Sequence, residues 1–358
     1  MIIKRLNCSG FRNFKEITVL PNENMNIIFG NNAEGKTNLL EAIWLFCGAK
    51  SFRGSKDREM VGFESEFAQN TCDYILGGIE KSAKITITKN RQAELNQKKL
   101  SSAGKLAGNF FCIVFSPQDL NLVNSGPAIR RRFLDTAIGQ IYPLYNEKLR
   151  RYVKAVSQRN SILKDSRYSG DLLGLLDDFE HTLSSLAFDI LRYRRRYCEL
   201  LSQTAPEIYS GIASNKEHID IEYSSEIGKS SSVYEIFELY KASRREDIIT
   251  KGTSIGPHRD DILINLDKRP LKNFGSQGQR RSAALALKLS EATVLKQVTG
   301  EYPIALLDDV MSELDKSRQN FILNHIKNWQ VFITCCDPDN ISALKSGSVF
   351  HMVGGNII

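Results

Sequence analysis

The chain has 358 residues, of which 42% are hydrophobic and 25% are charged, with a formal net charge of +7. This composition is typical of a folded globular protein and excludes a disordered or fibrous chain. No apolar stretch is long enough to span a membrane and the first residues lack a secretory pattern, so we expect a soluble, cytoplasmic protein.

The first part of the chain is predicted to be rich in strands. Alternation and turn residues predict strands at residues 1–7, 17–20, 25–29, 74–79, 83–88 and 110–115. Apolar residues between 37 and 47 recur at helical spacing, which predicts one helix there. A polar stretch rich in Lys, Gln and Asn lies between the strands expected at 83–88 and 110–115.

From residue 127 the pattern changes to long helices, which we expect at 127–139, 144–163 and 172–201. One further strand is expected at 219–223. A strand at 261–266 with a hairpin turn at 267–270 precedes a second α/β segment, with helices at 279–297 and 312–326 and strands at 304–307, 331–334 and 349–353.

This order of elements predicts an α/β fold with mixed sheets. We expect residues 1–120 and 251–358 to form one domain and residues 121–250 to form a mostly helical domain inserted into it. The seven cysteines include no C-x-x-C pair, so we expect reduced thiols and neither a zinc site nor a disulfide framework.

The strongest motif is a phosphate-binding loop between the expected strand at 25–29 and the first helix. It fits G-x-x-x-x-G-K-[ST] with Gly30, Asn31, Asn32, Ala33, Glu34, Gly35, Lys36 and Thr37. Glycines at such a turn let backbone N–H groups face a phosphate chain at a helix N-terminus. Lys36 would reach the β- and γ-phosphates of ATP, and Thr37 would bind Mg²⁺. The alternative is a chance glycine-rich turn.

A second motif supplies carboxylates for such a site. The apolar strand at 304–307 ends in Asp308 and Asp309, and a P-loop ATPase needs acidic groups of this kind opposite its phosphate loop. Asp308 would hold the Mg²⁺ shell, and Asp309 would orient or deprotonate the attacking water. A surface turn after a buried strand is the alternative interpretation.

A third motif, Ser276-Gln-Gly278-Gln279, opens the expected helix at 279–297. Together with the two motifs above it resembles the ATP-binding-cassette (ABC) ATPase heads, in which a Ser-x-Gly-Gln signature caps the nucleotide of a second subunit. The resemblance implies that Ser276, Gly278 and Gln279 contact ATP in trans, and that the fold is an ABC-type head.

Within that superfamily the chain resembles the RecF family of bacterial DNA replication and repair proteins. The resemblance covers nearly the whole chain and includes segments 10–14, 115–120, 130–135, 158–160, 256–261, 276–280 and 307–310. It implies an ATP-dependent homodimer that grips double-stranded and gapped DNA near single-strand junctions. It also implies slow, DNA-stimulated ATP hydrolysis as a timer, help in loading recombinase, and RecR with RecO as partners.

Further site residues follow from the resemblance. Arg12 and Asn13 correspond to an N-terminal pair that contacts the nucleotide, with simple loop packing as the alternative. Gln118 stands where cassette ATPases place a residue that senses Mg²⁺. Asp309 replaces the usual glutamate, and residues 334–336 lack a switch histidine, which is consistent with slow hydrolysis.

Positive charge is concentrated in the expected insertion. Residues 121–200 contain 14 Lys or Arg and 9 Asp or Glu, a surplus of 5. Charge runs of this kind are often solvated faces, but the RecF resemblance favours DNA phosphate contacts without base readout. The candidate DNA contacts are Arg130, Arg131, Arg150, Arg151, Arg194, Arg195 and Arg196.

Two other functions share parts of this pattern. A transporter's cytosolic ATPase subunit has the same motifs, but it would have neither the basic insertion nor the RecF-type segments. An SMC-like chromosome-organising protein would need a long heptad-bearing arm, for which the insertion is too short.

Overall fold

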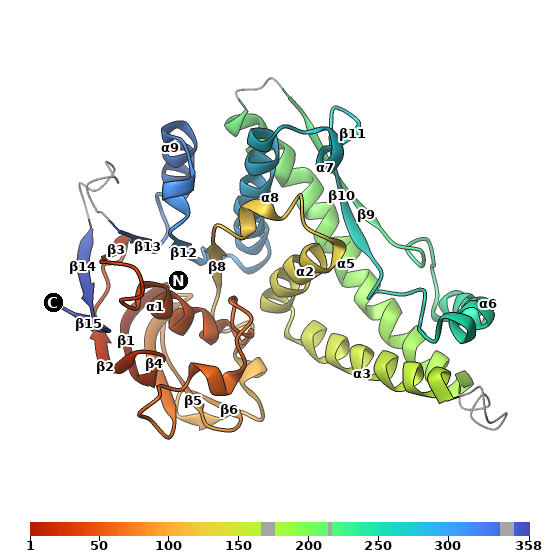
Figure 1. Ribbon diagram of the computed structural model, residues 1–358, viewed down its shortest axis with the longest axis horizontal. Helices are drawn as coiled ribbons and strands as arrows, with labels where there is room; N and C mark the ends of the chain where they lie inside the picture. Colours follow the sequence, from red (N-terminus) through yellow and green to blue (C-terminus); the bar gives the residue numbers. More distant parts are fainter. Residues whose placement is uncertain (166–175, 214–216, 337–346) are drawn as a thin grey trace.

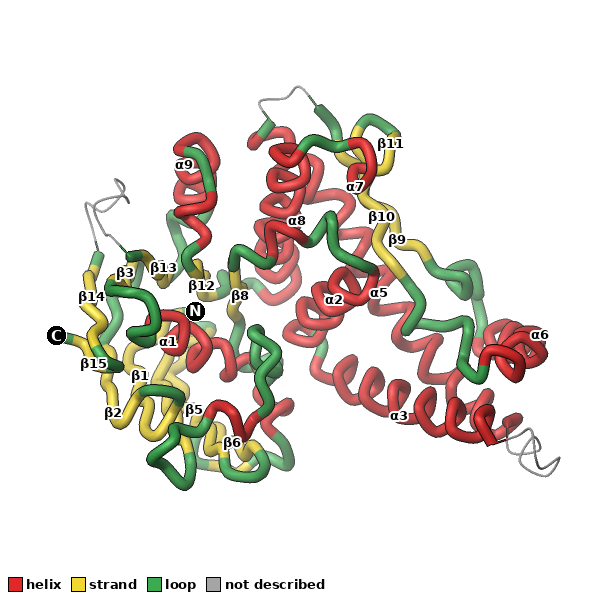
Figure 2. The backbone as a smooth tube through the Cα atoms, in the orientation of Figure 1, coloured by secondary structure: helices red, strands yellow, loops and turns green. Residues whose placement is uncertain are grey.

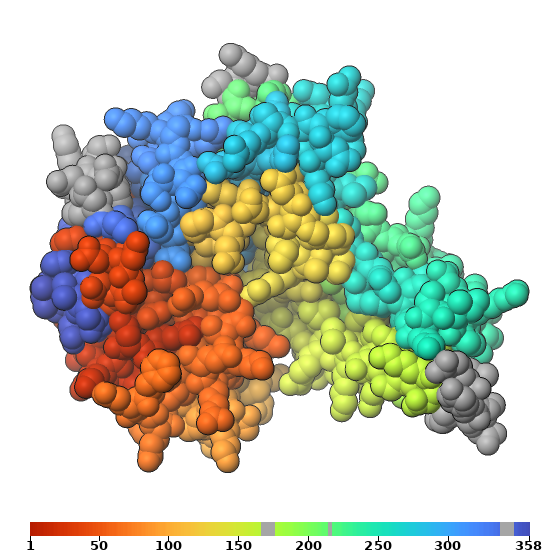
Figure 3. Space-filling model, in the orientation of Figure 1, coloured from red at the N-terminus to blue at the C-terminus, as the bar shows by residue number. Residues whose placement is uncertain are grey.

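The computed structural model describes residues 1–165, 176–213, 217–336 and 347–358. Figure 1 shows two lobes side by side: a β-rich lobe that contains both ends of the chain, and a lobe of long helices. The space-filling view in Figure 3 shows a hollow between the orange N-terminal segment and the yellow-green helix α3. Mixed sheets with a helical second lobe agree with the predicted α/β class.

An antiparallel sheet occupies most of the N-terminal lobe. Its order is β2-β1-β4-β5-β6-β7. The strands are β1 (Ile2–Phe11), β2 (Phe14–Val19), β4 (Ala68–Leu76), β5 (Ile79–Ile87), β6 (Arg91–Leu95) and β7 (Lys98–Lys99). Buried and exposed side chains alternate along most of them, so the sheet has one face on the core and one in solvent.

The sheet differs from the predicted strands in two places. The strand expected at 74–79 is interrupted, because Gly77 and Gly78 have φ values of 60° and 75° and form the hairpin turn between β4 and β5. The polar stretch 89–99, for which no element was predicted, contains β6 and β7. Only Ala93 of β6 is buried, so the strand shows almost no apolar alternation.

The second sheet is parallel apart from one edge strand, with the order β15-β14-β3-β13-β12-β8. Its strands are β3 (Met25–Phe29), β8 (Cys112–Phe115), β12 (Ile304–Asp308), β13 (Val331–Cys335), β14 (Ser348–Val353) and β15 (Asn356–Ile357). The strands β8, β12 and β13 are buried along their whole length, which explains their continuous apolar sequences. Helix α1 (Lys36–Trp44) follows β3.

The helical lobe follows β8. It contains α2 (Pro127–Ile141), α3 (Pro143–Asp165), α5 (Leu176–Ile212) and α6 (Val233–Thr250). The first part of the helix expected at 172–201 lies outside the described residues, and α5 continues past Pro206 because Ala205, Ile208 and Tyr209 extend its buried stripe. Helix α6 is absent from the predicted elements, since exposed Tyr234 and Ile249 blur its apolar face.

A small sheet and the later helices cover α5. The sheet order is β11-β10-β9, with β9 (Ile219–Ser224), β10 (Asp261–Leu266) and β11 (Arg269–Pro270). The later helices are α7 (Leu271–Phe274), α8 (Gln277–Thr299) and α9 (Lys316–His325). Helix α9 begins later than predicted, because Val310–Glu313 forms a separate 3-10 turn and Asp315 caps the helix.

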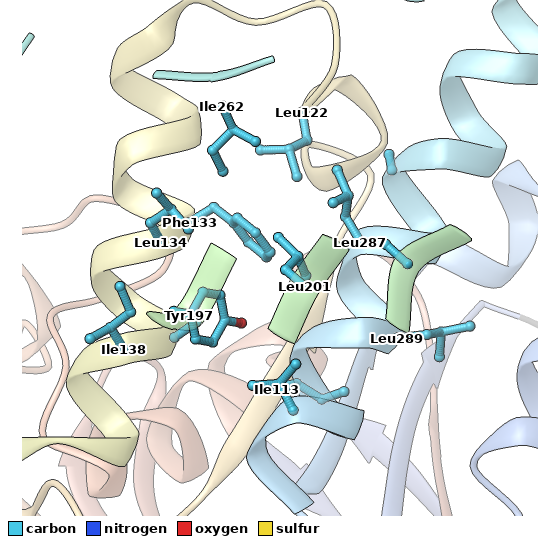
Figure 4. Close-up of a cluster of buried hydrophobic side chains, with 14 of the residues drawn as sticks. Ile113, Leu122, Phe133, Leu134, Ile138, Tyr197, Leu201, Ile262, Leu287 and Leu289 are labelled. Atoms are coloured by element: carbon cyan, nitrogen blue, oxygen red, sulfur yellow. The ribbon is translucent and has the colours of Figure 1, made fainter. Parts of the chain in front are cut away.

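Helix α8 packs against α5 and β8, and Figure 4 shows the apolar cluster that they share with α2. Phe133, Leu201 and Leu287 come from three different helices and meet there. Figure 2 shows the division between red helices and yellow strands.

Because β9 pairs with β10, contacts cross the predicted domain boundary at residue 250. The division at that residue stays a prediction. No helix in the described residues is long and apolar enough to cross a membrane.

Candidate nucleotide site

The candidate site lies at the edge where the parallel strands end. In the register, Leu307 lies between Phe115 and Ile333, and Asp308 lies beside Thr334. Loop 30–37 leaves the same edge after β3, which pairs with β13. The sheet therefore brings the phosphate-binding loop and the carboxylate of Asp308 together, although they are far apart in the sequence.

The loop needs its glycines. Gly30 and Gly35 have φ values of 152° and 116°. A Cβ atom on Gly30 would lie 2.3 Å from the carbonyl oxygen of Met352, and one on Gly35 would lie 2.9 Å from the side chain of Asn13. Any larger residue would therefore have to displace the backbone or the neighbouring strands.

Lys36 and Thr37 begin α1 and have different partners. The ammonium of Lys36 donates to the carbonyl oxygens of Gly30 and Asn31 at 2.5 and 2.8 Å, so it lies along the loop itself. The hydroxyl of Thr37 donates to Oδ1 of Asp308 at 2.7 Å. These contacts put a cation, a hydroxyl and a carboxylate at one helix N-terminus, where the dipole favours a phosphate.

Asp308 is 8% exposed, and burial raises its pKa, while hydrogen bonds from Thr37 and Thr334 oppose the shift. A divalent cation would offset the cost of this buried charge. Mg²⁺ typically takes one or two protein oxygens and completes its shell with phosphates and water. The described residues contain no group of three His, Cys, Asp or Glu placed to hold a metal by themselves. The donor set therefore fits Mg²⁺ bound together with a nucleotide.

Asp309 differs from its neighbour in being exposed. Its backbone is left-handed with φ 51°, and its N–H donates to the hydroxyl of Thr334 at 2.9 Å. Asp309 stands at the N-terminus of the 3-10 turn Val310–Glu313, which follows β12. The side chain is thus open to solvent next to Asp308, as a group that contacts a water would need to be.

Asn13 contacts the loop directly. Its amide donates to the carbonyl oxygen of Glu34 at 2.9 Å, and the backbone N–H of Gly355 donates to the same oxygen at 2.9 Å. The N–H of Gly354 donates to the Glu34 carboxylate. The turn between β14 and β15 therefore braces the phosphate-binding loop at Glu34.

Arg12 is linked to helix α1 and not to the phosphate-binding loop itself. Its guanidinium donates from Nε and from a terminal nitrogen to the two carboxylate oxygens of Glu41, at 2.8 and 3.0 Å. Glu41 is fully buried in α1. Arg12 thus fastens α1, and none of its described hydrogen bonds goes to residues 30–37.

Sequence reasoning missed three residues at this site: Asn38, Arg53 and Cys336. Arg53 donates to Oδ1 of Asn38 at 2.9 Å, and its charge lowers the pKa of Asp308, against the larger effect of burial. Cys336, in the segment without a switch histidine, places its sulfur 3.8 Å from Nζ of Lys36. The loop that carries Arg53 shows no period or motif, so only the fold reveals its position.

Ser276 and Gln279 form a capping box at the start of α8. The Ser276 hydroxyl accepts from the N–H of Gln279 at 3.2 Å, and Oε1 of Gln279 accepts from the N–H of Ser276 at 2.6 Å. The Gln279 amide also donates to Glu217 at 2.8 Å, and the carbonyl oxygen of Gly278 accepts from Arg318 at 3.2 Å. No hydrogen bond in the described part of the chain joins this segment to residues 30–37.

Gln118 is exposed and follows β8, whose last residue Phe115 pairs with Leu307. It therefore lies at the same sheet edge as Asp308. No described hydrogen bond links the two side chains.

The candidate DNA arginines divide into two groups. Arg130 and Arg194 are 6% and 1% exposed and bind acidic residues inside the helical lobe, Arg130 with Asp261 and Arg194 with Asp135 and Asp260. A guanidinium that is buried and paired in this way is not available to a phosphate on the surface. We therefore correct the prediction and remove these two residues from the DNA contacts.

The remaining arginines are at least partly accessible. Arg131 and Arg195 are half-buried and donate to backbone carbonyls, Arg131 to Asp260 at 2.7 Å and Arg195 to Ser230 at 3.1 Å. The exposed members of the predicted set are Arg150 and Arg151 on α3 and Arg196 on α5.

Comparison with protein families matches residues 2–354 to the RecF/RecN/SMC N terminal domain. The chain is 38% identical to the DNA replication and repair protein RecF of Ruminiclostridium cellulolyticum, across 100% of this chain and 99% of the relative. It is 36% identical to RecF of Clostridium perfringens strain 13, with the same coverage.

Solved structures of similar proteins agree with this result. The recombination mediator protein RecF of the RecFOR pathway, solved with ATP, superposes with a TM-score of 0.91 and is 34% identical, across 100% of this chain and 97% of that one. Its structure with ATPrS gives a TM-score of 0.92. An SMC head domain from Pyrococcus furiosus, at 14% identity and a TM-score of 0.56, shares the fold.

Proposed function

Because this chain belongs to the RecF family of DNA replication and repair proteins and has the ABC-type ATPase head fold, we propose that it is an ATP-dependent DNA-binding protein of recombinational repair. The observation that carries the proposal is the contact between Thr37 and Asp308. It joins the phosphate-binding loop after β3 to the carboxylate at the end of β12, on the far side of β13, as hydrolysis of a nucleotide requires.

In the proposed site the N–H groups of loop 30–37 bind the phosphates of ATP. Lys36 would turn from its own loop carbonyls to the β- and γ-phosphates, and Thr37, Asp308 and Gln118 would hold Mg²⁺. When bound, Mg²⁺ would supply positive charge to offset the charge that develops on the phosphates. Asn13 would keep its hydrogen bond to the carbonyl of Glu34 and so support the loop.

Asp309 would hold the attacking water. Its carboxylate is one methylene shorter than the glutamate of most cassette ATPases, so water is held less closely and proton transfer is less efficient. This supports slow hydrolysis that times release of the protein from DNA.

Two subunits would close head to tail around two ATP molecules. Ser276, Gly278 and Gln279 begin α8 in one lobe, whereas α1 lies in the other (Figure 1). A signature segment placed in this way would serve a second subunit, and the N-terminus of α8 would direct its partial positive charge at the partner's γ-phosphate.

The exposed arginines Arg150, Arg151 and Arg196 would bind duplex DNA through its phosphates when the dimer forms. The partly accessible Arg131 and Arg195 would need to leave their carbonyl partners to do so. The same proposal includes binding of gapped DNA and stimulation of ATP hydrolysis by DNA. It also includes help in recombinase loading with RecR and RecO, and a cytoplasmic, nucleoid-associated location. Membership of the RecF family supports these parts of the proposal.

The test is a calorimetric titration with ATP and Mg²⁺ together with sedimentation with and without ATP and gapped duplex DNA. Wild type should bind ATP and sediment as a dimer only with nucleotide. Lys36→Ala should lose both properties, whereas the matched variant Lys99→Ala, which removes an exposed lysine on β7, should keep them. A wild-type protein that binds no ATP, or whose DNA binding ignores ATP, would refute the proposal.

A further inference from the structure

Three consecutive arginines of α2 fasten this helix to two different parts of the molecule. Arg130 binds both carboxylate oxygens of Asp261 at 2.7 Å, and Arg131 donates to the carbonyl oxygen of Asp260 at 2.7 Å. Both bonds fasten α2 to the start of β10 within the helical lobe. Arg132 points the other way, toward the N-terminal lobe.

Arg132 reaches the loop that connects α1 to β4. One of its terminal nitrogens donates to the carbonyl oxygens of Ser51 and Phe52, at 2.9 and 3.2 Å. Among the described residues, no other side chain of α2 makes a hydrogen bond to residues 48–60. Carbonyl oxygens accept from any correctly placed donor, so the link depends on the position of Arg132 and not on the sequence of the loop.

The same loop is tied to the candidate nucleotide site. The hydroxyl of Ser51 donates to the buried carboxylate of Glu41 in α1, and the N–H of Arg53 donates to Oγ of Ser51 at 3.1 Å. Arg53 then donates from its side chain to Asn38, which follows Thr37 in α1. A chain of bonds therefore runs from α2 through the loop to the first turn of the nucleotide-binding helix.

We propose that Arg132 is a positioning residue that couples the helical lobe to the nucleotide site by holding the loop of Arg53. This inference rests on the proposed function, since it assumes that a nucleotide binds at loop 30–37. When ATP draws Arg53 and Asn38 toward the phosphates, the loop carbonyls draw Arg132 and α2 with them. Arg130 and Arg131 pass the displacement on to β10.

Coupling in the reverse direction follows from thermodynamic linkage. DNA that favours one position of the helical lobe moves α2, and α2 moves the loop that carries Arg53. Arg132 thus fastens α2 to the N-terminal lobe, although in the sequence it looks like part of a DNA-binding run. Loss of Arg132 should uncouple the lobes without removing a residue that contacts ATP.

Hydrogen exchange followed by mass spectrometry tests the coupling, with and without Mg²⁺ and a non-hydrolysable ATP analogue. The protein should be dilute enough to sediment as a monomer, so that dimer contacts do not contribute. In wild type, the analogue should slow exchange both at residues 48–56 and in α2. In Arg132→Ala, protection at 48–56 should remain and protection of α2 should disappear.

Two variants control for charge and for local structure. Arg58 is exposed in the 3-10 turn Asp57–Met60 and makes no described contact with α2, so Arg58→Ala should behave like wild type. Arg132→Lys keeps a donor within reach of the carbonyls and should restore protection of α2.

Equal protection of α2 in wild type and Arg132→Ala would overturn the inference. So would a wild type that binds the analogue and protects residues 48–56 but leaves α2 unchanged, a result that does not depend on any variant. Absence of analogue binding by wild type would instead overturn the proposed function, and with it the premise of the coupling.

Discussion

The hydroxyl of Thr37 lies 2.7 Å from Oδ1 of Asp308, and 271 positions separate the two residues in the chain. The contact joins the first turn of α1 to the end of β12 across β13. Because Thr334 donates to the same oxygen at 3.0 Å, Asp308 is held in place by hydroxyl groups that need not move when a cation binds.

Replacement of Asp308 by Asn should separate metal binding from folding. The Asn oxygen still accepts from Thr37 and Thr334, but it carries no charge for Mg²⁺. Burial raises the pKa of Asp308, so removal of the charge should leave the free energy of unfolding unchanged or higher. We expect ATP affinity in Mg²⁺ to fall to the value measured in EDTA. Calorimetry in both buffers and thermal unfolding check this, and unchanged affinity in Mg²⁺ would contradict it.

Ser276→Arg should prevent ATP-dependent dimers while leaving ATP binding intact. The variant also loses the helix cap of α8, which costs about 1 kcal/mol of stability. Ser276→Ala loses the same cap without adding bulk or charge, so it serves as the control for helix stability. Sedimentation equilibrium with ATP should give monomers for the Arg variant and at least some dimer for the Ala variant. Dimers of wild-type strength in Ser276→Arg would place the interface elsewhere.

The exposed arginines should determine the salt dependence of DNA binding. Replacement of Arg150, Arg151 and Arg196 by Ala should reduce the slope of log affinity against log salt by about 0.9 for each DNA phosphate that the variant no longer neutralises. Fluorescence anisotropy on several unrelated duplexes with ATP measures this slope. A slope identical to that of wild type would move the DNA surface to another face.

Arg194 provides the contrasting case. Its replacement by Ala leaves the buried carboxylate of Asp260 without its cation, and we expect the free energy of unfolding to fall by about 3–5 kcal/mol. Weaker DNA binding by that variant would therefore report on folding. Denaturant unfolding distinguishes the two effects.

Protonation of His258 should lower the folding stability in mild acid. Burial lowers the pKa of His258, which accepts a hydrogen bond from Tyr152 and donates one to the carbonyl of Thr253, an arrangement that needs the neutral ring. The unfolded state then binds more protons, so this contribution is complete above a pH of about 6.5 and is lost progressively below it. Unfolding measured from pH 7 to 5 should show a smaller loss of stability in His258→Gln. An identical decrease in the free energy of unfolding of wild type and His258→Gln would rule out His258 as the cause.

Alkylation of Cys336 should block nucleotide binding. Its thiol is exposed and lies 3.3 Å from Oδ1 of Asn32, beside Lys36, while the six other cysteines are buried. Iodoacetamide should add a group where the phosphates would lie, and ATP with Mg²⁺ should slow the modification. Cys336→Ser should bind ATP before and after treatment. Alkylated wild type that binds ATP normally would show that the segment moves away from the loop.

The sequence predicted the parts of the site that depend on local patterns. Loop 30–37 and Asp308 follow buried strands whose apolar runs are easy to recognise, and parallel strands bring their carboxyl ends to one edge. Arg130 and Arg194 could not be assigned correctly, because a run of arginines reads the same whether it faces solvent or internal acids. The acids that bind them lie on distant elements: Asp135, Asp260 and Asp261. Arg53 was missed for a related reason, since its loop is placed by tertiary contacts with Glu41 and Arg132.

The contact between Glu34 and the β14–β15 turn has a consequence for the order in which the molecule is assembled. Strand β3, which carries the phosphate-binding loop, pairs with β13 and β14, both made hundreds of residues later. During synthesis the loop therefore leaves the ribosome long before any strand exists to hold it, and the whole helical lobe is made in between. Long-range pairing of this kind slows folding, because a large loop must close before the contacts form. A chain that stalls before Val331 would contain every residue of the phosphate-binding loop and still lack β13 and β14, the two strands that hold β3 in the sheet.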